Sequence, residues 1–255
     1  MSISRLIPLL LVTALIGCRV GAGNNTAKPQ ELTIAAATNM YDLLGEASKG
    51  FERKEKVKVT IASGSTGHLA AQIERGAPFD LFLSADVQTV DRLISKGELE
   101  EQTKRIYARG QLVLWQPADA PTEISQLTDL AKPEFKKIAL ANPDIAPYGR
   151  ATIDTLTNAG LIEKVKDKLV YAENVSQAKQ YAETGNAQAV FISKSLARDG
   201  QGRAIPVDER LHRPIDQALA VITSSRRQSE ARRFIEYLAS SEGVKLLQEY
   251  GYQIP

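Results

Sequence analysis

The stretch 57–86, VKVTIASGSTGHLAAQIERGAPFDLFLSAD, constrains the fold more than any other part of the chain. At its start, apolar residues alternate with Lys58 and Thr60, which is the period of a strand with one buried face. Apolar residues then recur at helical spacing until Gly76, a residue type that commonly ends helices. The short apolar segment 81–83 is typical of a buried parallel strand. The stretch therefore predicts two parallel strands joined by a helix.

The loop inside this unit, 63–67, has the sequence SGSTG. Its glycines permit a tight turn, and the helix that follows presents unpaired N–H groups and the positive end of its dipole to small anions. The hydroxyl groups of Ser63, Ser65 and Thr66 can add donors. The loop has neither the Lys-Ser/Thr pair of a P-loop nor G-x-G-x-x-G spacing, so nucleotide binding is disfavoured. The simpler alternative is that Thr66 only caps the helix.

A second unit of the same kind precedes this one. The segment 32–37, LTIAAA, predicts a strand, and Thr38 and Asn39 follow it before an amphipathic helix. Asn39 with Asp42 three residues later resembles a capping box. Because parallel strands bind ligands beyond their carboxyl ends, we expect Thr38 and Asn39 to meet the loop 63–67 there.

The second half of the chain repeats this layout. Segments 137–141, 169–172 and 188–192 predict strands, and the polar turns 146–149 and 174–176 each follow a strand and precede a helix. Units of this kind look alike in many proteins, so chance similarity is the alternative to a true repeat. Two α/β lobes nevertheless fit the order of elements better than one continuous sheet.

Two segments of the chain would join the lobes. The strands expected at 111–115 and 217–223 carry the chain across, which makes a two-segment hinge. The first lobe is then expected to comprise residues 31–112 and 218–255, and the second lobe residues 113–217. The four polar turns of the two lobes would face one cleft.

The N-terminus has the features of a targeting segment. Residues 1–18 contain Arg5 and a mostly apolar run, 6–16, that is shorter than the ~20 residues a membrane-spanning helix needs. The sequence LIGC that ends at Cys18 resembles a bacterial lipobox, in which the cysteine is acylated and becomes the mature N-terminus. The alternative is an ordinary secretory signal with an incidental cysteine. Residues 19–30 are small and polar, as in a flexible tether.

Composition narrows the class of protein. The 255 residues carry a formal net charge of +2, with 43% hydrophobic and 24% charged residues, which is typical of a soluble globular protein without a nucleic-acid surface. The single cysteine rules out a disulfide framework. We expect a monomer with no nucleic-acid partner.

The four turns carry neutral hydroxyl and amide side chains, and the first two contain no Lys or Arg. A fully deprotonated oxyanion needs only donors, which helix N-termini supply without a counter-charge. Phosphate carries a proton at neutral pH and would need an acceptor as well. Asp42, Asp144 and Glu173 lie close enough to the turns in sequence to leave that point open.

An enzyme is the main alternative class. The chain has two histidines, His68 and His212, and neither belongs to a G-x-S-x-G or H-E-x-x-H motif. His68 directly follows the Ser/Thr loop, so a Ser–His dyad of a hydrolase is the alternative, although helix geometry more simply points this side chain to solvent. Two histidines also argue against a transition-metal cation site. We therefore expect no catalytic residues.

Several motifs resemble the molybdate-binding proteins that feed ABC transporters. They are TIAAATNM, IASGSTGHLAAQIERGAPFDLFLSAD, IALANPDIAPYGRA, ENVSQA and EYGYQIP, and together they extend over nearly all of the expected mature chain. The resemblance implies a type II periplasmic-binding-protein fold. In this fold two α/β lobes, joined by a two-segment hinge, close on an unhydrated tetrahedral oxyanion.

Matching motifs imply which residues would bind the anion. The donors would be Thr38, Asn39, Ser65 or Thr66, and the backbone N–H groups of Tyr148 and Val175. The metal atom of the anion would be contacted only through its oxygens, by Thr38, Thr66, Tyr148 and Val175. Some family members place a tyrosine at the end of the strand matching 190–193. This chain has Ser193 there, so that contact does not carry over.

The resemblance also implies a function. We expect an extracytoplasmic solute-binding protein that captures molybdate, and tungstate with it, and delivers it to the permease subunit of an ABC transporter. It would lie in the periplasm or on the outer face of the cell envelope, anchored through Cys18, and would need no cofactor. The alternative within binding proteins is another tetrahedral oxyanion such as sulfate.

Overall fold

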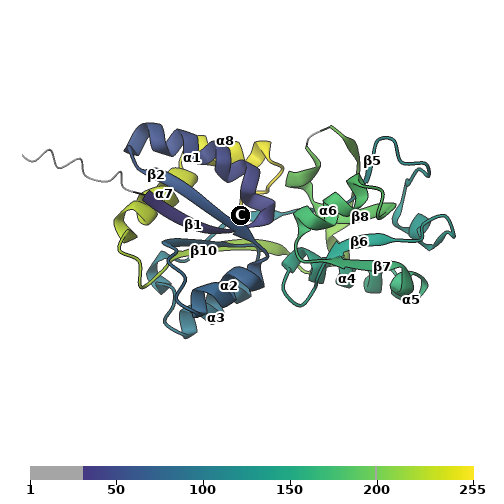
Figure 1. Cartoon of the computed structure of the whole chain (residues 1–255), viewed down its shortest axis with the longest axis horizontal. Helices are drawn as coiled ribbons and strands as arrows, with labels where there is room; N and C mark the ends of the chain where they lie inside the picture. The colour runs from purple at the N-terminus through teal and green to yellow at the C-terminus, as the bar shows by residue number, and fades with distance from the viewer. Residues whose placement is uncertain (1–30, 199) are drawn as a thin grey trace, which may run out of the picture.

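Two α/β lobes make up the computed structural model, which describes residues 31–198 and 200–255 (Figure 1). Each lobe is built on its own five-stranded mixed sheet. The expected signal peptide, lipobox cysteine Cys18 and tether all lie outside the described residues.

The first lobe has the strand order β2-β1-β3-β10-β4. Its strands are β1 (Glu31–Ala37), β2 (Lys58–Gly64), β3 (Leu81–Ser84), β4 (Arg105–Gly110) and β10 (Ile215–Val221). Its helices are η1 (Thr38–Met40), α1 (Tyr41–Glu55), α2 (Thr66–Glu74), α3 (Val87–Ser95), η2 (Glu101–Thr103), α7 (Gln228–Ala239) and α8 (Ser241–Glu249). Strand β1 pairs in parallel with β2 and β3, whereas β10 runs antiparallel to β3 and β4.

The second lobe has the strand order β7-β6-β8-β5-β9. Its strands are β5 (Leu112–Pro117), β6 (Ile138–Ala141), β7 (Leu169–Ala172), β8 (Ala189–Ser193) and β9 (Gly202–Pro206). Its helices are η3 (Leu127–Ala131), α4 (Pro147–Asn158), α5 (Ile162–Val165), η4 (Lys166–Lys168), α6 (Val175–Glu183), η5 (Lys194–Ala197) and η6 (Glu209–Leu211). Strand β6 pairs in parallel with β7 and β8, and β5 is antiparallel to β8 and β9.

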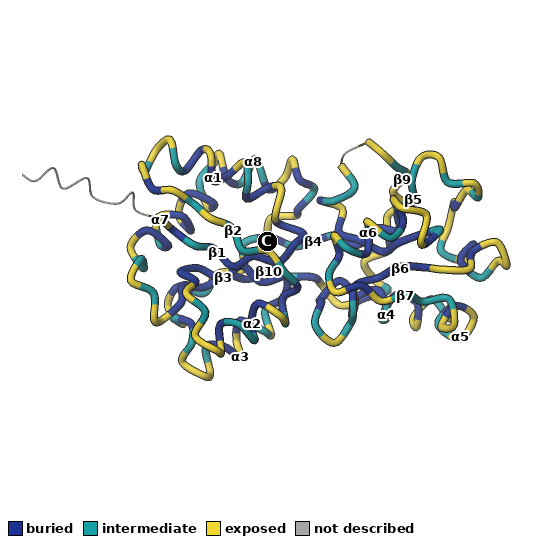
Figure 2. Tube along the Cα trace, viewed as in Figure 1, coloured by how far each residue is buried: buried dark blue, intermediate teal, exposed yellow. Residues whose placement is uncertain are grey.

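Both sheets are covered on both faces, which explains their almost continuous apolar strands. In the first lobe, Leu32 and Ile34 of β1 pack on the side of α1, α7 and α8, while Ala35 packs on the side of α2 and α3 (Figure 1). In the second lobe, Leu114 of β5 faces α4 and Trp115 faces α6. Figure 2 shows the buried backbone concentrated in the strands and at the junction of the lobes.

The chain changes sheet twice. It first passes from β4 to β5 at Gln111, and it later returns between β9 and β10. The expected lobe boundaries after residues 112 and 217 stay a prediction, although Leu112 already pairs with Ser193 in the second sheet. Gln253, near the C-terminus, exchanges two backbone hydrogen bonds with Arg109 of β4 (N···O 2.8 and 3.0 Å), so the end of the chain lies beside the crossing strands.

The strand ends and helix ends expected from the sequence are largely confirmed. Gly76, Gly97, Gly160 and Gly185 each follow a helix with φ between 65° and 78°, the left-handed region that glycine adopts without strain. The returning strand is shifted from the expected 217–223 to Ile215–Val221. Strands β4 and β9 were not expected, because charged side chains such as Arg105 and Arg203 break their apolar pattern.

Candidate functional site

The expected turns meet around one small cavity between the lobes. It encloses ≈ 10 Å³, and all six predicted binding residues line it. They are Thr38, Asn39, Ser65, Thr66, Tyr148 and Val175. Within the described residues, the lining contains no Asp, Glu, Lys, Arg or His side chain. The cavity is therefore polar but carries no formal charge.

Helix N-termini from both lobes supply the polarity of this cavity. The 3₁₀ helix η1 and helix α2 begin there in the first lobe, and α4 and α6 begin there in the second. Pro147 opens α4 and has no N–H, so Tyr148 carries the first N–H of that helix. Asn174 caps α6 by accepting from the N–H of Gln177 (3.0 Å), which leaves the first N–H, that of Val175, without an intrahelical partner.

Ser65 provides the most direct sign of a missing ligand. Its side chain is 3% exposed, and its Oγ has no hydrogen-bond partner among the described residues. It occupies the N-cap position of α2, yet its hydroxyl makes no capping bond. A buried, unpaired hydroxyl costs free energy unless a bound molecule satisfies it. The Ser65 hydroxyl is thus available to a ligand in the cavity.

Thr66 has a different role from the helix cap that was the simpler expectation. It is the first residue of α2, and its Oγ1 accepts a hydrogen bond from the N–H of Ala85 (3.1 Å). This bond joins α2 to the end of β3 and uses Thr66 as an acceptor. The hydroxyl hydrogen can still be donated to a ligand.

Asn39 lines the cavity, but its side-chain NH₂ group has no hydrogen left for a ligand. Both hydrogens of its side-chain amide are used behind the cavity, since Nδ2 donates to Gln217 Oε1 (2.9 Å) and Tyr252 Oη (2.8 Å). The capping box expected with Asp42 is wrong, because Met40 is the N-cap of α1 and makes no side-chain capping bond. The buried partners satisfy Asn39 better than a helix cap would.

Tyr148 also points its side chain away from the cavity. Its hydroxyl accepts a hydrogen bond from Gln217 Nε2 (3.2 Å), and burial raises the pKa of Tyr148 well above 10. Burial likewise raises the pKa of Tyr252 to about 12. Both phenols are therefore neutral at physiological pH.

Ser193 does not line the small cavity. It is fully buried, and its Oγ lies 2.8 Å from Ser195 Oγ. Ser195 in turn donates to the carbonyl oxygen of Asn39 (2.8 Å), which links the second lobe to the η1 turn. The sequence analysis did not predict roles for Ser195, Gln217 or Tyr252, because their partners lie far away in the chain.

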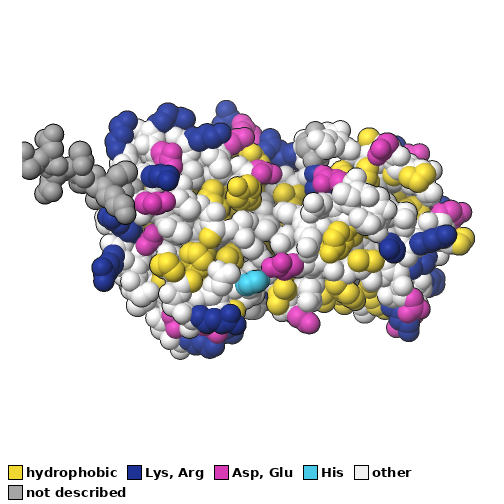
Figure 3. Space-filling model, in the orientation of Figure 1, with side chains coloured by type: hydrophobic (Ala, Val, Ile, Leu, Met, Phe, Trp, Pro, Cys, Tyr) yellow, Lys and Arg dark blue, Asp and Glu magenta, His cyan; other side chains and the backbone are white. Residues whose placement is uncertain are grey.

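The two lobes touch on both sides of the cavity. The N–H of Gly67 donates to the carbonyl oxygen of Ile145 (2.8 Å), and His68 Nδ1 lies 2.9 Å from Glu173 Oε1. His68 is exposed to solvent as expected, with 51% of its side chain accessible, and it also contacts Glu173 of the second lobe. Figure 3 shows a histidine side chain next to an acidic one where the lobes join. Since Ser65 Oγ has no partner, the described residues form no Ser65–His68 dyad.

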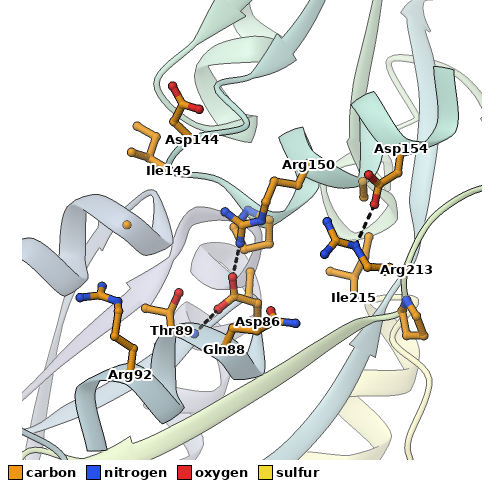
Figure 4. Close-up of a pocket in the computed structure, with 15 residues that line it drawn as sticks. Asp86, Gln88, Thr89, Arg92, Asp144, Ile145, Arg150, Asp154, Arg213 and Ile215 are labelled. Atoms are coloured by element: carbon orange, nitrogen blue, oxygen red, sulfur yellow. Dashed lines mark hydrogen bonds and ion pairs between the residues drawn. The ribbon is translucent and has the colours of Figure 1, made fainter. Parts of the chain in front are cut away.

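A larger cleft of ≈ 440 Å³ lies beside the small cavity, also between the lobes (Figure 4). Its arginines face carboxylates rather than open space. Arg150 of α4 bonds Asp86 of the first lobe, and Arg213 Nε lies 3.1 Å from Asp154 Oδ2 (Figure 4). The paired charges make this cleft a poor anion site, and the Arg150–Asp86 pair is a further contact between the lobes.

Comparisons with known proteins agree with this architecture. The family model described as bacterial extracellular solute-binding protein matches residues 32–253. The molybdate-binding protein ModA of Azotobacter vinelandii is 33% identical over 98% of this chain and 98% of its own. This chain belongs to the ModA family. The expected family and the two-lobed fold are thereby confirmed.

Solved structures extend the comparison. The periplasmic molybdate-binding protein of Azotobacter vinelandii superposes with a TM-score of 0.82 at 30% identity, covering 88% of this chain and 99% of that one. The sulfate-binding protein SubI of Mycobacterium tuberculosis matches with a TM-score of 0.71 at 16% identity, covering 88% and 87%. The second match shows the shared fold alone. Members of the ModA family are thus solute-binding transport proteins built on a scaffold that is used more widely.

Proposed function

We propose that this protein captures molybdate, and tungstate with it, in the small interlobe cavity and delivers it to the permease of an ABC transporter. The ModA relatives are named for molybdate binding, and this chain matches one of them over 98% of its length. The observation that carries the proposal is the buried Ser65 hydroxyl. It has no hydrogen-bond partner in the part of the chain that the structure describes, and Ser65 lines a cavity where helix N-termini of both lobes meet.

The donor set suits a dianion that carries no proton. Ser65 and Thr66 offer hydroxyl hydrogens, and the first turns of the surrounding helices offer N–H groups with the positive ends of their dipoles. The proposed ligand residues are Thr38, Asn39, Ser65, Thr66, Tyr148 and Val175. Each would contact oxygens of the anion, so the metal atom would need no direct protein ligand.

Phosphate fits this cavity less well. A protonated phosphate oxygen requires an acceptor, and the carboxylates considered for that role lie elsewhere. Among the described residues, Asp42, Asp144 and Glu173 are all absent from the cavity lining, and Glu173 pairs with His68. Sulfate, which is also a fully deprotonated tetrahedron, is the closer competitor.

Calorimetry against molybdate, tungstate, sulfate and phosphate tests the proposal directly. We expect one molybdate or tungstate per protein molecule, weaker binding of sulfate and no detectable binding of phosphate. If sulfate bound most tightly, sulfate and not molybdate would be the ligand. Failure of all four to bind would contradict an oxyanion receptor.

We further propose that the protein works at the outer face of the cell envelope, attached through an acylated Cys18. The apolar segment that ends in LIGC supports this location. Within residues 31–198 and 200–255, no helix is long and apolar enough to cross a membrane. The acyl chains on Cys18 would hold the protein at the membrane, and the tether 19–30 would let the lobes meet a permease while they stay in water.

A further inference from the structure

A buried glutamine lies directly behind the proposed anion site. Gln217 is in β10, fully buried, at a position where the pairing of β10 with β4 is interrupted by a bulge. Its Oε1 accepts hydrogen bonds from Asn39 Nδ2 (2.9 Å) and Tyr107 Oη (3.3 Å). Its Nε2 donates to Tyr148 Oη (3.2 Å). One side-chain amide therefore bonds to residues from both lobes.

Two of those partners are residues that line the cavity. Asn39 belongs to the η1 turn of the first lobe, and Tyr148 belongs to the first turn of α4 in the second. The side chains of both residues bond to Gln217, and both residues line the small cavity. The positions of the two turns relative to each other are thus tied through a single amide group.

The neighbouring strand leaves room for this bridge. A Cβ atom at Gly110 of β4 would lie 2.0 Å from Tyr148 Oη and 2.7 Å from Gln217 Nε2. Both distances are far below van der Waals contact, so only glycine fits there while the bridge is formed. Because a buried amide donates and accepts at fixed geometry, it can hold two groups apart as well as together.

We infer that Gln217 is a positioning residue for anion binding, which sets the separation of the Asn39 and Tyr148 turns and thereby the size of the oxyanion held between them. The inference rests on the proposed function, since it assumes that those turns contact the anion. Removing the bridge lets the turns approach each other, which favours a smaller tetrahedron. Gln217 thus contributes to the preference for molybdate over sulfate.

Gln217→Met tests this, because methionine has a similar length and makes no comparable hydrogen bonds. Tyr148→Phe removes the other end of the bridge and keeps the backbone N–H. The matched control is Gln116→Met, since Gln116 is also a buried glutamine, but its bonds to Thr122 O (2.8 Å) and the N–H of Ile124 (2.6 Å) lie inside the second lobe. Dissociation constants for molybdate, and for sulfate by competition, are measured on protein shown to be folded by its melting transition.

We expect Gln217→Met and Tyr148→Phe to weaken molybdate binding roughly tenfold, the scale of one net hydrogen bond, and to lower the molybdate-to-sulfate affinity ratio. Gln116→Met should lower the melting temperature and leave the ratio unchanged. The role of Gln217 would be overturned if folded Gln217→Met or Tyr148→Phe kept the wild-type molybdate affinity and the wild-type molybdate-to-sulfate affinity ratio. If Ser65→Ala lost binding in the same experiment, the proposed function would stay intact. If Ser65→Ala also bound molybdate as the wild type does, both the proposed site and this inference would be overturned.

Discussion

The backbone N–H of Gly67 donates a 2.8 Å hydrogen bond to the carbonyl oxygen of Ile145, and this bond joins the first turn of α2 to the loop before α4 across the lobe boundary. A Cβ atom at position 67 would lie 3.0 Å from Ile145 Cα and 3.1 Å from its carbonyl oxygen. Any side chain larger than that of glycine at position 67 would therefore limit how closely the lobes can approach. Gly67 lies one residue after Thr66 of the proposed anion site.

Gly67→Ala should weaken anion binding without destabilising the ligand-free protein. The added methyl group would press on the Ile145 backbone, and overpacking of this kind costs roughly 1–3 kcal/mol, or about fivefold or more in dissociation constant. Within one lobe the change is harmless, because alanine favours helix relative to glycine. Calorimetry with molybdate and a thermal melt of the ligand-free protein measure the two effects separately.

Gly45→Ala is the matched control for that experiment. Gly45 is also in a helix of the first lobe, α1, and a Cβ atom there would meet nothing within 4 Å. It should bind molybdate as the wild type does. If Gly67→Ala and Gly45→Ala bound equally well, close approach of the lobes at Ile145 would not contribute to binding.

The turns at the cavity could be predicted from the sequence because each is a local signal. Strand periodicity, the run SGSTG and the glycines that follow several helices are all readable within a few residues. They placed Ser65 and Thr66 at a helix N-terminus, as the structure has them. The different roles of Ser65 and Thr66 could not be predicted from the sequence. They depend on Ala85, which donates to Thr66 from the end of another strand.

Ser65→Ala should lower molybdate affinity about ten- to a hundredfold and leave the stability of the ligand-free protein unchanged or higher. A hydrogen bond to a charged ligand contributes roughly 1.5–3 kcal/mol, whereas the unliganded Ser65 hydroxyl has no partner to lose. Calorimetry and a thermal melt test the two halves of this prediction. Wild-type affinity in a folded Ser65→Ala protein would remove Ser65 from the site.

Thr66→Val should also weaken binding, but with a loss of stability that Ser65→Ala does not show. Valine keeps the shape of threonine and removes the acceptor of the Ala85 N–H, which is buried. An unsatisfied buried N–H costs about 1–3 kcal/mol, which a thermal melt of the ligand-free protein would detect. A melting temperature equal to that of the wild type would show that the Thr66–Ala85 bond does not contribute to stability.

The long-range contacts behind the site could not be predicted, since they join residues far apart in the chain. Asn39 looked like a helix cap because its local pattern with Asp42 is that of a capping box, yet its amide bonds Gln217 and Tyr252, 178 and 213 residues away. The only hint was a glutamine at the start of an otherwise apolar strand, QALAV, which must find buried partners. Sequence patterns predict contacts between near neighbours, whereas a buried polar group bonds to whichever partner the fold brings close to it.

The N-terminus should be lipid-modified at Cys18. If LIGC is a lipobox, the envelope-bound protein begins at residue 18 with acyl chains attached, and Cys18→Ser would be released into the soluble fraction. Intact-mass spectrometry of protein extracted from the native envelope measures the modification. Cleavage at another residue, with Cys18 unmodified, would contradict this prediction.

His68→Ala should weaken molybdate binding only slightly, through the contact with Glu173. The pair crosses the lobe boundary, but both side chains are about half exposed, and exposed pairs of this kind contribute roughly 0.2–1 kcal/mol, or at most about fivefold in affinity. The double-mutant cycle with Glu173→Ala isolates this coupling. The contact joins the lobes, so its loss should raise the dissociation rate of molybdate, measured by stopped flow, and leave the melting temperature of the ligand-free protein nearly unchanged. Two outcomes would contradict this prediction. Folded His68→Ala could lose molybdate binding altogether, or the wild type could show a hydrolytic activity that this variant lacks. Either result would make His68 a ligand-binding or catalytic group.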